Sequence, residues 1–521
     1  MNAPQISEDL TDRIIRYCEI DTGSIEGVKN EDGTLKVPST PGQRVFAELL
    51  AQEASAMGYQ VDFLDAGLRV RAKATKEGIV PIMMGAHLDT SEEAPSKDIE
   101  VIVHENYQGQ NLVLKDDVVI SPQDKGFEKL NEYKGDTLFT SNGKTLLGGD
   151  DKAGAAGLMT FLKYLKETGE DHGDIDVFFT YDEETGLEGA SLIDPEKDTN
   201  AKYGFVFDNA DGDLGVNSFN AASAYLELPQ QGLDQEFTGE KVTVTLNGIS
   251  TFPGHGKDEG MIDAYRNLPG VAAILEDAGA VITNIQGSSG KIELEVLVSD
   301  PKEIAALSKI TDTRFDPAKL LKEGKNVVDV KYHQEQGSSS QTYHLGELVG
   351  MVNDIPYEMS AEQTEGIQGY IQPLQFKVLD GKLFARTLLR DFETDGLEAK
   401  RELIRRIAPS AEIKEEYMNK AEILAENPQV IDAAVLAMER AGVTNVKQTE
   451  VRGGDESGVY TLSVKTMTGE SEPGRRIPSV NVGIMGPGIH TKKECLALGA
   501  VVRGFKTMVE LNRMAVNGYL N

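Results

Sequence analysis

The sequence predicts an α/β protein whose main domain holds a mixed, mostly parallel sheet flanked by helices, with a smaller α+β domain inserted into it. Three observations predict this fold. Helical and strand patterns alternate over the first two hundred residues, which is typical of βα units around a parallel sheet. From about residue 217, strands of alternating apolar and polar residues are interleaved with helices. At 521 residues, the chain is also longer than one hydrophobic core normally organises.

The elements of the main domain are recognised by their periodicity. "PGQRVFAELLAQEASAMG" predicts a helix, "YQVDFLD" and "LRVRAKA" predict a hairpin, and "GAAGLMTFLKYLKETG" predicts a helix that ends at Gly169. Three apolar runs, "IVPIMMGAHLDT", "DIDVFFTYDEETG" and "KYGFVFDNADG", predict buried strands with polar residues at their ends. The helix "NPQVIDAAVLAMERAG" and the strand "SVNVGIM" indicate that the chain returns to this domain near its C-terminus.

The inserted domain is predicted from a second set of patterns. Strands are expected at "AASAYLEL", "KVTVTLNG", "KIELEVLVS" and "GKLFARTLLRDFE", and helices at "GMIDAYRNLPGVAAILEDAG" and "GLEAKRELIRRIA". The polar segment 332–345 predicts a loop or a hairpin tip. We therefore expect the main domain to comprise residues 1–216 and 419–521, and the inserted domain to comprise residues 217–418.

Composition excludes several classes of partner. There are 52 basic and 85 acidic residues, a net charge of −33, which argues against nucleic acid and anionic membranes as partners. The apolar runs are far shorter than the ~20 residues of a membrane span, and the acidic N-terminus does not resemble a signal peptide. Two cysteines, Cys18 and Cys495, provide no disulfide framework. A cytoplasmic protein is expected.

Acidic residues and histidines gather at the ends of the predicted strands. Each group alone has an ordinary explanation, such as a helix cap, a solvated face or a core histidine. In a parallel sheet, however, these ends meet at one edge. Several carboxylates there would repel one another unless cations neutralised them, and imidazole with carboxylate suits zinc, manganese or cobalt. The groups are His87 and Asp89; Asp150 and Asp151; Asp182, Glu183 and Glu184; Asp208 and Asp211; and His490 and Glu494.

Longer motifs in the same order carry a family resemblance. They include "VPSTPGQ", "GAHLDT", "ENYQG", "TLLGGDDKAG", "HGDIDVFFTYDEETG", "SFNAAS", "MSAEQTEGIQGY", "LLRDFETDGLEAK", "VRGGDESG" and "HTKKE". The chain resembles the peptidase T family of tripeptide aminopeptidases, within the superfamily of dinuclear zinc aminopeptidases and carboxypeptidases. The resemblance implies a catalytic main domain and an inserted lid domain. It does not extend to residues 270–355, which form an extra-long insertion in the lid.

The resemblance also implies roles for individual residues. The ligands of two divalent metal ions would be His87, Asp150, Glu184, Asp208 and His490; zinc is the expected metal, with cobalt and manganese as alternatives. Asp150 would bridge the two ions, and a cis peptide would link it to Asp151. Glu183 would be the general base, and Asp89 would orient the imidazole of His87. Asp208 is preferred to Asp211 because it ends the apolar run "GFVF".

Substrate-binding residues are implied in the same way. Arg390 and Arg452 match arginines that suit the C-terminal carboxylate of a short peptide, and Asn220 is a further contact candidate. The chain departs from the family at Phe252, where an "HPG" triplet would supply an oxyanion-binding histidine across a homodimer formed through the lid. His255 is the candidate replacement for that donor.

Three functions follow from these residues. The first is a metal-dependent aminopeptidase that removes the N-terminal residue from tripeptides or other short peptides. The second keeps the metals and the base but cleaves dipeptides or N-acyl amino acids. The third is a metal-binding relative without catalytic activity, which the missing lid histidine favours and the intact Glu183 opposes.

Overall fold

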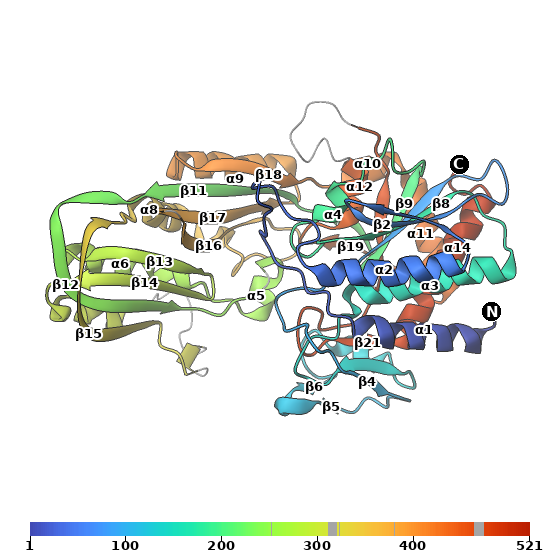
Figure 1. The fold of residues 1–521 in the computed structure, drawn as a ribbon, viewed down its shortest axis with the longest axis horizontal. Helices are drawn as coiled ribbons and strands as arrows, with labels where there is room; N and C mark the ends of the chain where they lie inside the picture. Colours follow the sequence, from blue (N-terminus) through green and yellow to red (C-terminus); the bar gives the residue numbers. More distant parts are fainter. Residues whose placement is uncertain (252, 311–319, 322–323, 380, 463–473) are drawn as a thin grey trace. The chain divides into compact units, whose positions relative to one another are not determined.

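The computed structural model of the protein describes residues 1–251, 253–310, 320–321, 324–379, 381–462 and 474–521 (Figure 1). The chain divides into two units. Unit 1 comprises Met1–Ser218 and Lys420–Asn521, and unit 2 comprises Phe219–Asn419. The boundaries expected from the sequence, 216/217 and 418/419, fall within two residues of these divisions. The catalytic and lid roles of the two units stay predictions.

Unit 1 is built on an eight-stranded mixed sheet with a parallel centre. Strands β8, β3, β9 and β20 lie side by side and run parallel. The predicted hairpin is confirmed, because β1 and β2 pair antiparallel at one edge. In spatial order the strands are β1 (Gln60–Leu64), β2 (Gly67–Ala72), β8 (Ile175–Thr180), β3 (Ile82–His87), β9 (Tyr203–Ala210), β20 (Ser479–Met485), β10 (Asp213–Ser218) and β19 (Lys447–Val451).

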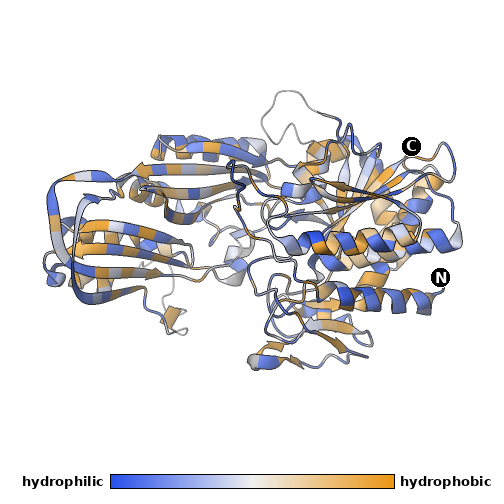
Figure 2. Ribbon diagram, viewed as in Figure 1, coloured by the Kyte–Doolittle hydropathy of each residue, from blue (hydrophilic) through white to orange (hydrophobic). Residues whose placement is uncertain are grey.

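Helix α3 (Gly149–Thr168) packs on the central strands β3, β9 and β20 of this sheet. Its small residues allow the close approach: a Cβ at Gly154 would meet the backbone oxygen of Phe207 in β9 at 2.6 Å. Gly169 ends the helix in the left-handed conformation, as predicted. The other α-helices that the structure describes in unit 1 are α1 (Ala3–Cys18), α2 (Pro41–Ala56), α4 (Glu188–Ser191), α10 (Ala421–Glu426), α11 (Pro428–Ala441), α12 (Glu456–Leu462) and α14 (Leu498–Val516). Apolar residues concentrate on the strands between these helices (Figure 2).

A small three-stranded sheet in unit 1 joins the C-terminal segment to the middle of the chain. Cys495 pairs with Thr140, so the segment after His490 lies beside the segment that leads to α3. The strands are β4 (Val101–His104), β7 (Leu138–Ser141) and β21 (Cys495–Ala497). Nearby lie the pair β5 (Leu112–Val113) and β6 (Val119–Ile120) and the short helices η1 (Lys115–Asp117) and η2 (Glu128–Asn131).

Unit 2 contains an eight-stranded sheet in which every strand pair of the described residues is antiparallel. In spatial order the strands are β15 (Val328–Thr342), β12 (Gln231–Asn247), β14 (Lys291–Val298), β13 (Val281–Ser288), β16 (Tyr370–Leu379), β17 (Lys382–Asp391), β11 (Asn220–Pro229) and β18 (Glu412–Tyr417). The helices of its described residues are η3 (Pro253–His255), α5 (Gly256–Glu259), η4 (Ala264–Asn267), α6 (Leu268–Asp277), η5 (Pro301–Lys309), α8 (Gly346–Asp354), η6 (Tyr357–Met359) and α9 (Thr394–Ile407).

The prediction of a loop or hairpin tip over 332–345 was wrong. Most of this segment belongs to β15, which pairs with β12 at the edge of the sheet, Tyr332 opposite Val242. An edge strand keeps one side towards solvent, so it tolerates polar residues that would be unfavourable in a central strand.

The helix predicted over residues 260–279 is α-helical only from Leu268 onwards. Ile262 forms a bridge with Ile249, and the turn before Leu268 is a 3-10 helix. Pro269 lies in the first turn of α6, where its missing N–H has no partner to lose, so the proline marks the start of the α-helix.

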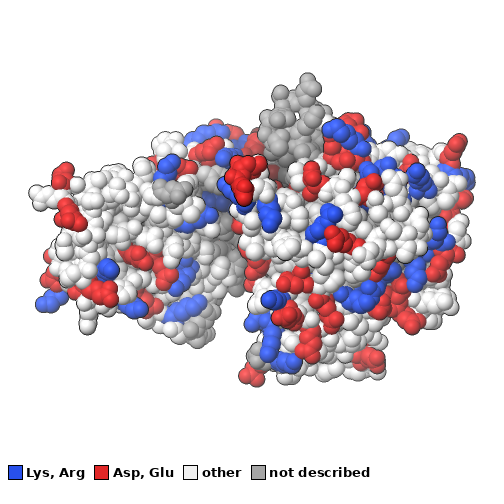
Figure 3. Space-filling model, viewed as in Figure 1, with Lys and Arg blue, Asp and Glu red and all other residues white. Residues whose placement is uncertain are grey.

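The surface of the chain mixes both signs of charge. On the face drawn in Figure 3, acidic and basic side chains are interspersed. Of the helices that the structure describes, none combines the length and the apolar character that crossing a membrane requires.

Candidate metal centre

Five of the residues singled out by the sequence meet in unit 1. His87 ends β3, and Asp208 lies in β9. Asp150 is the second residue of α3, Glu184 follows β8, and His490 follows β20. The Nε2 atom of His87 lies 2.9 Å from Oδ1 of Asp150 and 3.7 Å from Oδ1 of Asp208. The Nε2 atom of His490 lies 3.2 Å from Oδ2 of Asp150 and 2.8 Å from Oε1 of Glu184. The parallel centre of the sheet therefore brings these groups to one place.

Asp150 is the residue that connects the two imidazoles, because each of its carboxylate oxygens faces a different ring. The expected cis peptide between Asp150 and Asp151 is confirmed. Asp151 turns away: its carboxylate accepts hydrogen bonds from the backbone N–H groups of His87 at 3.1 Å and of Gly154 at 3.0 Å. The two adjacent aspartates thus make different contacts: Asp150 faces the two imidazoles, and Asp151 accepts hydrogen bonds from backbone N–H groups.

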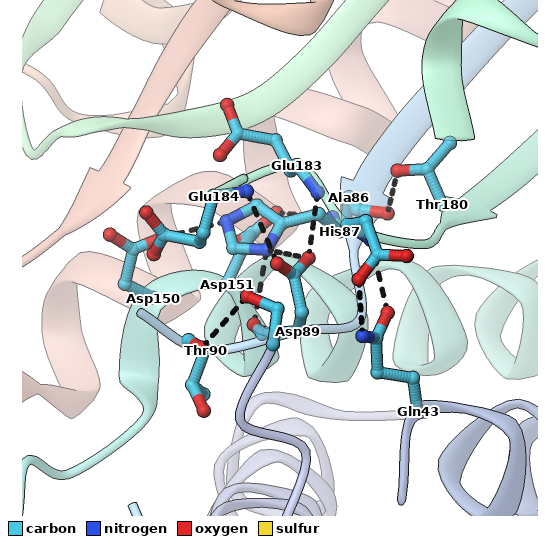
Figure 4. A network of polar contacts seen from close by, with 12 residues as sticks. Gln43, Ala86, His87, Asp89, Thr90, Asp150, Asp151, Thr180, Glu183 and Glu184 are labelled. Carbon is cyan, nitrogen blue, oxygen red and sulfur yellow. Dashed lines mark hydrogen bonds and ion pairs between the residues drawn. The ribbon is translucent and has the colours of Figure 1, made fainter. Parts of the chain in front are cut away.

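Asp89 contacts both the ring of His87 and the turn that carries Glu183 and Glu184. Its Oδ1 lies 3.3 Å from Nδ1 of His87. The same carboxylate accepts hydrogen bonds from the backbone N–H of Glu183 at 2.9 Å and of Glu184 at 3.1 Å (Figure 4). Asp89 is fully buried. Its position fits the predicted orienting role and extends it to the Glu183–Glu184 turn.

Asp182 fixes the other side of this turn, a role that the sequence prediction missed. It adopts a left-handed conformation, with φ at 51°. Its carboxylate accepts hydrogen bonds from the backbone N–H of Ser39 at 2.7 Å and from Nε2 of Gln43 at 2.6 Å, while its own N–H donates to Oε1 of Gln43 at 3.0 Å. The only signal in the sequence was its place directly before Glu183.

Two further acidic residues support His490 and its loop. Glu93 lies with Oε2 at 3.3 Å from Nδ1 of His490, the nitrogen that faces away from Asp150. Glu494 is buried and contacts the corner before Asp150. Glu93 was not predicted, since nothing in "SEEAPS" distinguishes it from a solvated acidic residue.

The donor atoms fit divalent cations. Among the described residues, three overlapping groups place their ligand atoms within 4.8 Å of one another: His87, Glu183 and Glu184; His87, Asp151 and Asp208; and Asp150, Glu184 and His490. The Oε1 atom of Glu184 is buried and close to His490 but forms no hydrogen bond, as expected for two ligands that share an ion. Imidazoles and carboxylates suit zinc, manganese and cobalt.

The carboxylates of this site raise the pKa values of His87 and His490 against the effect of burial, but the two imidazoles do not neutralise all of the carboxyls. Burial raises the pKa of Glu184 to about 7 and that of Asp208 to about 6. Burial, together with the charges of Asp208 and Glu184, also raises the pKa of Glu183 well above its ordinary value. For Asp150 burial acts in the same direction, but the imidazoles of His490 and His87 override it and lower the pKa of this carboxyl. A divalent cation would displace the extra protons from such a site.

Asp211, the alternative to Asp208, has different partners. Its carboxylate lies 2.6 Å from Nη2 of Arg503 and accepts a hydrogen bond from the hydroxyl of Tyr133 at 3.1 Å. An aspartate already neutralised by arginine is a poor metal ligand. The geometry therefore supports the choice of Asp208.

The candidate substrate residues lie in both units. Arg452, in unit 1, is buried just after β19. Arg390, in unit 2, donates to the backbone oxygen of Ala222 at 2.9 Å and pairs with Glu416 at 2.6 Å. Asn220, also in unit 2, donates to the backbone oxygen of Phe392 at 2.9 Å and accepts from the N–H of Asn419 at 2.9 Å.

The candidate oxyanion donor His255 ends η3, and its side chain lies outside the described residues, as does Phe252. The substrate roles of these residues, like the roles given to the metal-site residues, stay predictions.

Comparison with known proteins identifies the family. Residues 117–513 match the family described as peptidase family M20/M25/M40. The chain belongs to this family. It is 34% identical over 390 residues to a peptidase T of Listeria monocytogenes, covering 71% of this chain and 87% of that protein. It is 30% identical over 386 residues to a peptidase T of Brevibacillus brevis, covering 70% and 86%. These relatives confirm the resemblance and show that the chain is a metallopeptidase.

Solved structures share the fold. An aminopeptidase PepT from Bacillus cereus matches with a TM-score of 0.50 and 16% identity, covering 98% of this chain and 99% of the other. An aminoacylhistidine dipeptidase from Vibrio alginolyticus matches with a TM-score of 0.53 and 15% identity, covering 97% and 96%. The predicted fold class, a mixed α/β domain with an inserted α+β domain, is confirmed.

Proposed function

We propose that this metallopeptidase uses two divalent metal ions to remove the N-terminal residue of tripeptides or other short peptides. One observation carries the proposal: the carboxylate of Asp150 lies between two imidazoles, with one oxygen 2.9 Å from His87 and the other 3.2 Å from His490. A carboxylate with this arrangement suits the bridge between two ions. One ion would have His87 and Asp208 as its other ligands, and the second would have Glu184 and His490.

Zinc is the proposed metal, with cobalt and manganese as alternatives, because the donors are imidazoles and carboxylates. When bound, such ions supply polarisation of the scissile carbonyl and a lowered pKa for water in the site. The fully buried Asp89 would hold both the ring of His87 and the turn that carries Glu183 and Glu184. These contacts would hold the proposed ligands in place.

Glu183 is the proposed general base. Its backbone N–H donates to Asp89, and the residue is partly buried. In Figure 4 this carboxylate points away from those of Asp150 and Glu184. A carboxyl whose pKa is raised by burial accepts a proton from water more readily than an exposed one, and it can then deliver that proton to the leaving amine.

The substrate proposal rests on the arginines and on the relatives that carry the name peptidase T. A guanidinium fork binds a terminal carboxylate with two parallel hydrogen bonds, so Arg452 and Arg390 are proposed to select short peptides with a free C-terminus. Arg390 would exchange part of its contact with Glu416 for the substrate. Asn220 and His255 remain candidates, for a substrate contact and for an oxyanion donor respectively.

Two further proposals concern the setting of the protein. A homodimer formed through unit 2 is proposed by analogy with the family, and it would let His255 act on the partner's site. A cytoplasmic location is proposed because both cysteines, Cys18 and Cys495, are buried and unpaired.

The test combines metal analysis with a substrate panel. Purified protein is stripped of metal, reloaded with zinc, cobalt or manganese, and assayed on tripeptides, dipeptides and N-acyl amino acids. We expect about two ions per chain and the fastest turnover on tripeptides. Faster turnover of dipeptides or N-acyl amino acids would replace the substrate proposal, whereas two bound ions without turnover on any substrate would indicate a silent metal-binding relative.

A further inference from the structure

Glu494 holds the corner of the chain that carries Asp150. Its Oε2 accepts hydrogen bonds from the backbone N–H groups of Leu147 and Gly148, each at 2.8 Å. Its Oε1 accepts one from the backbone N–H of Asp150 itself, at 3.1 Å. The side chain is only 3% exposed. A buried carboxylate that accepts three N–H donors fixes the backbone that supplies them.

The same carboxylate also belongs to the loop that supplies His490. Glu494 lies four residues after His490 and directly before β21, whose Cys495 pairs with Thr140 of β7. His490 in turn lies 3.2 Å from Oδ2 of Asp150. Asp150 is therefore held from two sides by the same loop. Its carboxylate faces the imidazole of His490, and its backbone N–H donates to Glu494 of the loop that carries His490.

We propose that Glu494 is a positioning residue that sets the distance between Asp150 and His490 and thereby the affinity of the site for divalent cations. The inference rests on the proposed function, because it takes Asp150 and His490 as metal ligands. Glu494 itself does not contact the substrate or an ion in this scheme. It acts through the backbone of one ligand and the loop of the other, and such supporting contacts typically change metal affinity by about 10- to 100-fold.

The two oxygens of Glu494 serve different parts of the corner, which permits a selective variant. In Glu494→Gln, the amide oxygen can replace Oε2 and keep the bonds from Leu147 and Gly148. The amide NH2 then faces the N–H of Asp150, so that two donors oppose each other. The variant therefore removes the hydrogen bond to the backbone of Asp150 and keeps those to Leu147 and Gly148.

The test compares four full-length proteins: wild type, Glu494→Gln, Glu494→Asp and the control Glu170→Gln. Glu170 lies just beyond the other end of α3, where it accepts hydrogen bonds from Nε of Arg513 at 2.6 Å and from the hydroxyl of Tyr164 at 2.8 Å. Its replacement removes a charged contact beside the same helix but far from Asp150 in the sequence. Each metal-free protein is titrated with zinc against a coloured chelator, and the visible spectrum of the cobalt-loaded form is recorded.

We expect Glu494→Gln to lose about 10- to 100-fold in zinc affinity and to change the cobalt spectrum, which reports ligand geometry. Glu170→Gln should lower the melting temperature but keep zinc affinity within about threefold of wild type. In the metal-free proteins, hydrogen exchange of the segment 147–150 should be faster in Glu494→Gln than in wild type, a readout that involves no metal.

Three results would overturn the inference. Wild-type zinc affinity and an unchanged cobalt spectrum in Glu494→Gln would overturn it while leaving the proposed function intact. A wild-type protein that binds no divalent cation would overturn both. If Glu494→Gln does not fold, Glu494→Asp tests the inference instead, because it keeps the charge but has a side chain one methylene shorter. Weaker zinc binding by Glu494→Asp than by Glu170→Gln supports the inference. Equal zinc binding by these two variants overturns it.

Discussion

The pKa values of Glu184 in unit 1 and Glu416 in unit 2 are shifted in opposite directions. Burial raises the pKa of both carboxyls, and for Glu184 it prevails over the imidazole of His490, which leaves the pKa at about 7. For Glu416 the charges of Arg390 and Arg386 outweigh burial and lower the pKa to about 2. Glu416 is therefore neutralised by arginines of its own unit, whereas the acids of the site in unit 1 remain short of positive charge.

The sheets explain part of this difference. In unit 1 the central strands run parallel, so the residues that follow them meet at one edge, where His87 and Glu184 now lie. In unit 2 the described strand pairs are antiparallel, and the polar residues lie along the strands, where Arg390 and Glu416 pair across β17, β11 and β18. Buried acids at converging strand ends that lack positive partners therefore indicate a cation site more strongly than a buried acid that is paired with arginines.

The largest expected effect is on turnover. Glu183→Gln removes the proton acceptor but keeps the shape of the side chain, so we expect kcat to fall by about a thousandfold or more. Metal content, measured by elemental analysis, should stay at the wild-type value, because Glu183 is proposed to take the proton and not to bind an ion.

A matched control in unit 2 is Glu227→Gln. Glu227 forms an exposed ion pair with Lys382 at 2.9 Å, and its loss should leave kcat unchanged. Wild-type turnover in Glu183→Gln would show that Glu183 is not the general base. Replacing an acid of the site in unit 1 would then have no more effect on turnover than replacing Glu227 in unit 2.

The second expected effect is a metal-dependent response to pH. Asp208 and Glu184, with pKa values of about 6 and 7 in the folded metal-free protein, hold protons that the unfolded chain releases near pH 4. Their contribution to stability is therefore complete below about pH 4 and is lost as the pH rises through 6 and 7. Added zinc replaces these protons, so the gain in melting temperature on adding zinc should be larger at pH 8 than at pH 5.5. Equal gains at both values would contradict the shortage of positive charge in unit 1.

Much of the fold could be predicted because it follows from local periodicity. β20 and the hairpin of β1 and β2 appear where alternation or apolar runs predicted them. β15 was missed because its polar sequence makes sense only at the edge of a sheet, and the edge is a property of the whole unit. The start of α6 was missed because the prediction did not use Pro269, which lies in the first turn of the helix.

The candidate site divides in the same way. His87, Asp150 and His490 could be selected because each follows or ends a recognisable apolar segment. The contacts that support them could not be selected, because they join residues far apart in the sequence: Asp182 with Ser39, and Glu494 with Gly148. Such contacts depend on which loops the finished fold places side by side.

A smaller effect is expected for the buried acid of unit 2. Glu416→Gln leaves Arg386 and Arg390 without their charged partner, which should cost about 2 kcal/mol of unfolding free energy near neutral pH. Because the pKa of Glu416 is lowered when folded, this stabilisation is present above about pH 4.5 and is lost as the pH falls towards 2. Denaturant unfolding at pH 7 and pH 4 should therefore show a smaller difference between variant and wild type at the lower pH. A difference that grows at pH 4 would contradict the ion pairs.

The smallest effect is expected for Asn220. The sequence predicts a substrate contact for this residue, whereas the structure shows hydrogen bonds to the backbone of unit 2. Its amide group joins β11 to the backbone of Phe392 and Asn419, so Asn220→Ala should lower the unfolding free energy by about 1–2 kcal/mol. If the amide also contacts the substrate, KM for a tripeptide should rise while kcat changes little, and the increase should be absent in Glu227→Gln. Steady-state kinetics at a temperature well below both melting points separate the two roles. A stable Asn220→Ala with raised KM would make this residue a binding contact, whereas a destabilised variant with wild-type KM would place Asn220, like Glu416, among the residues that hold unit 2 together.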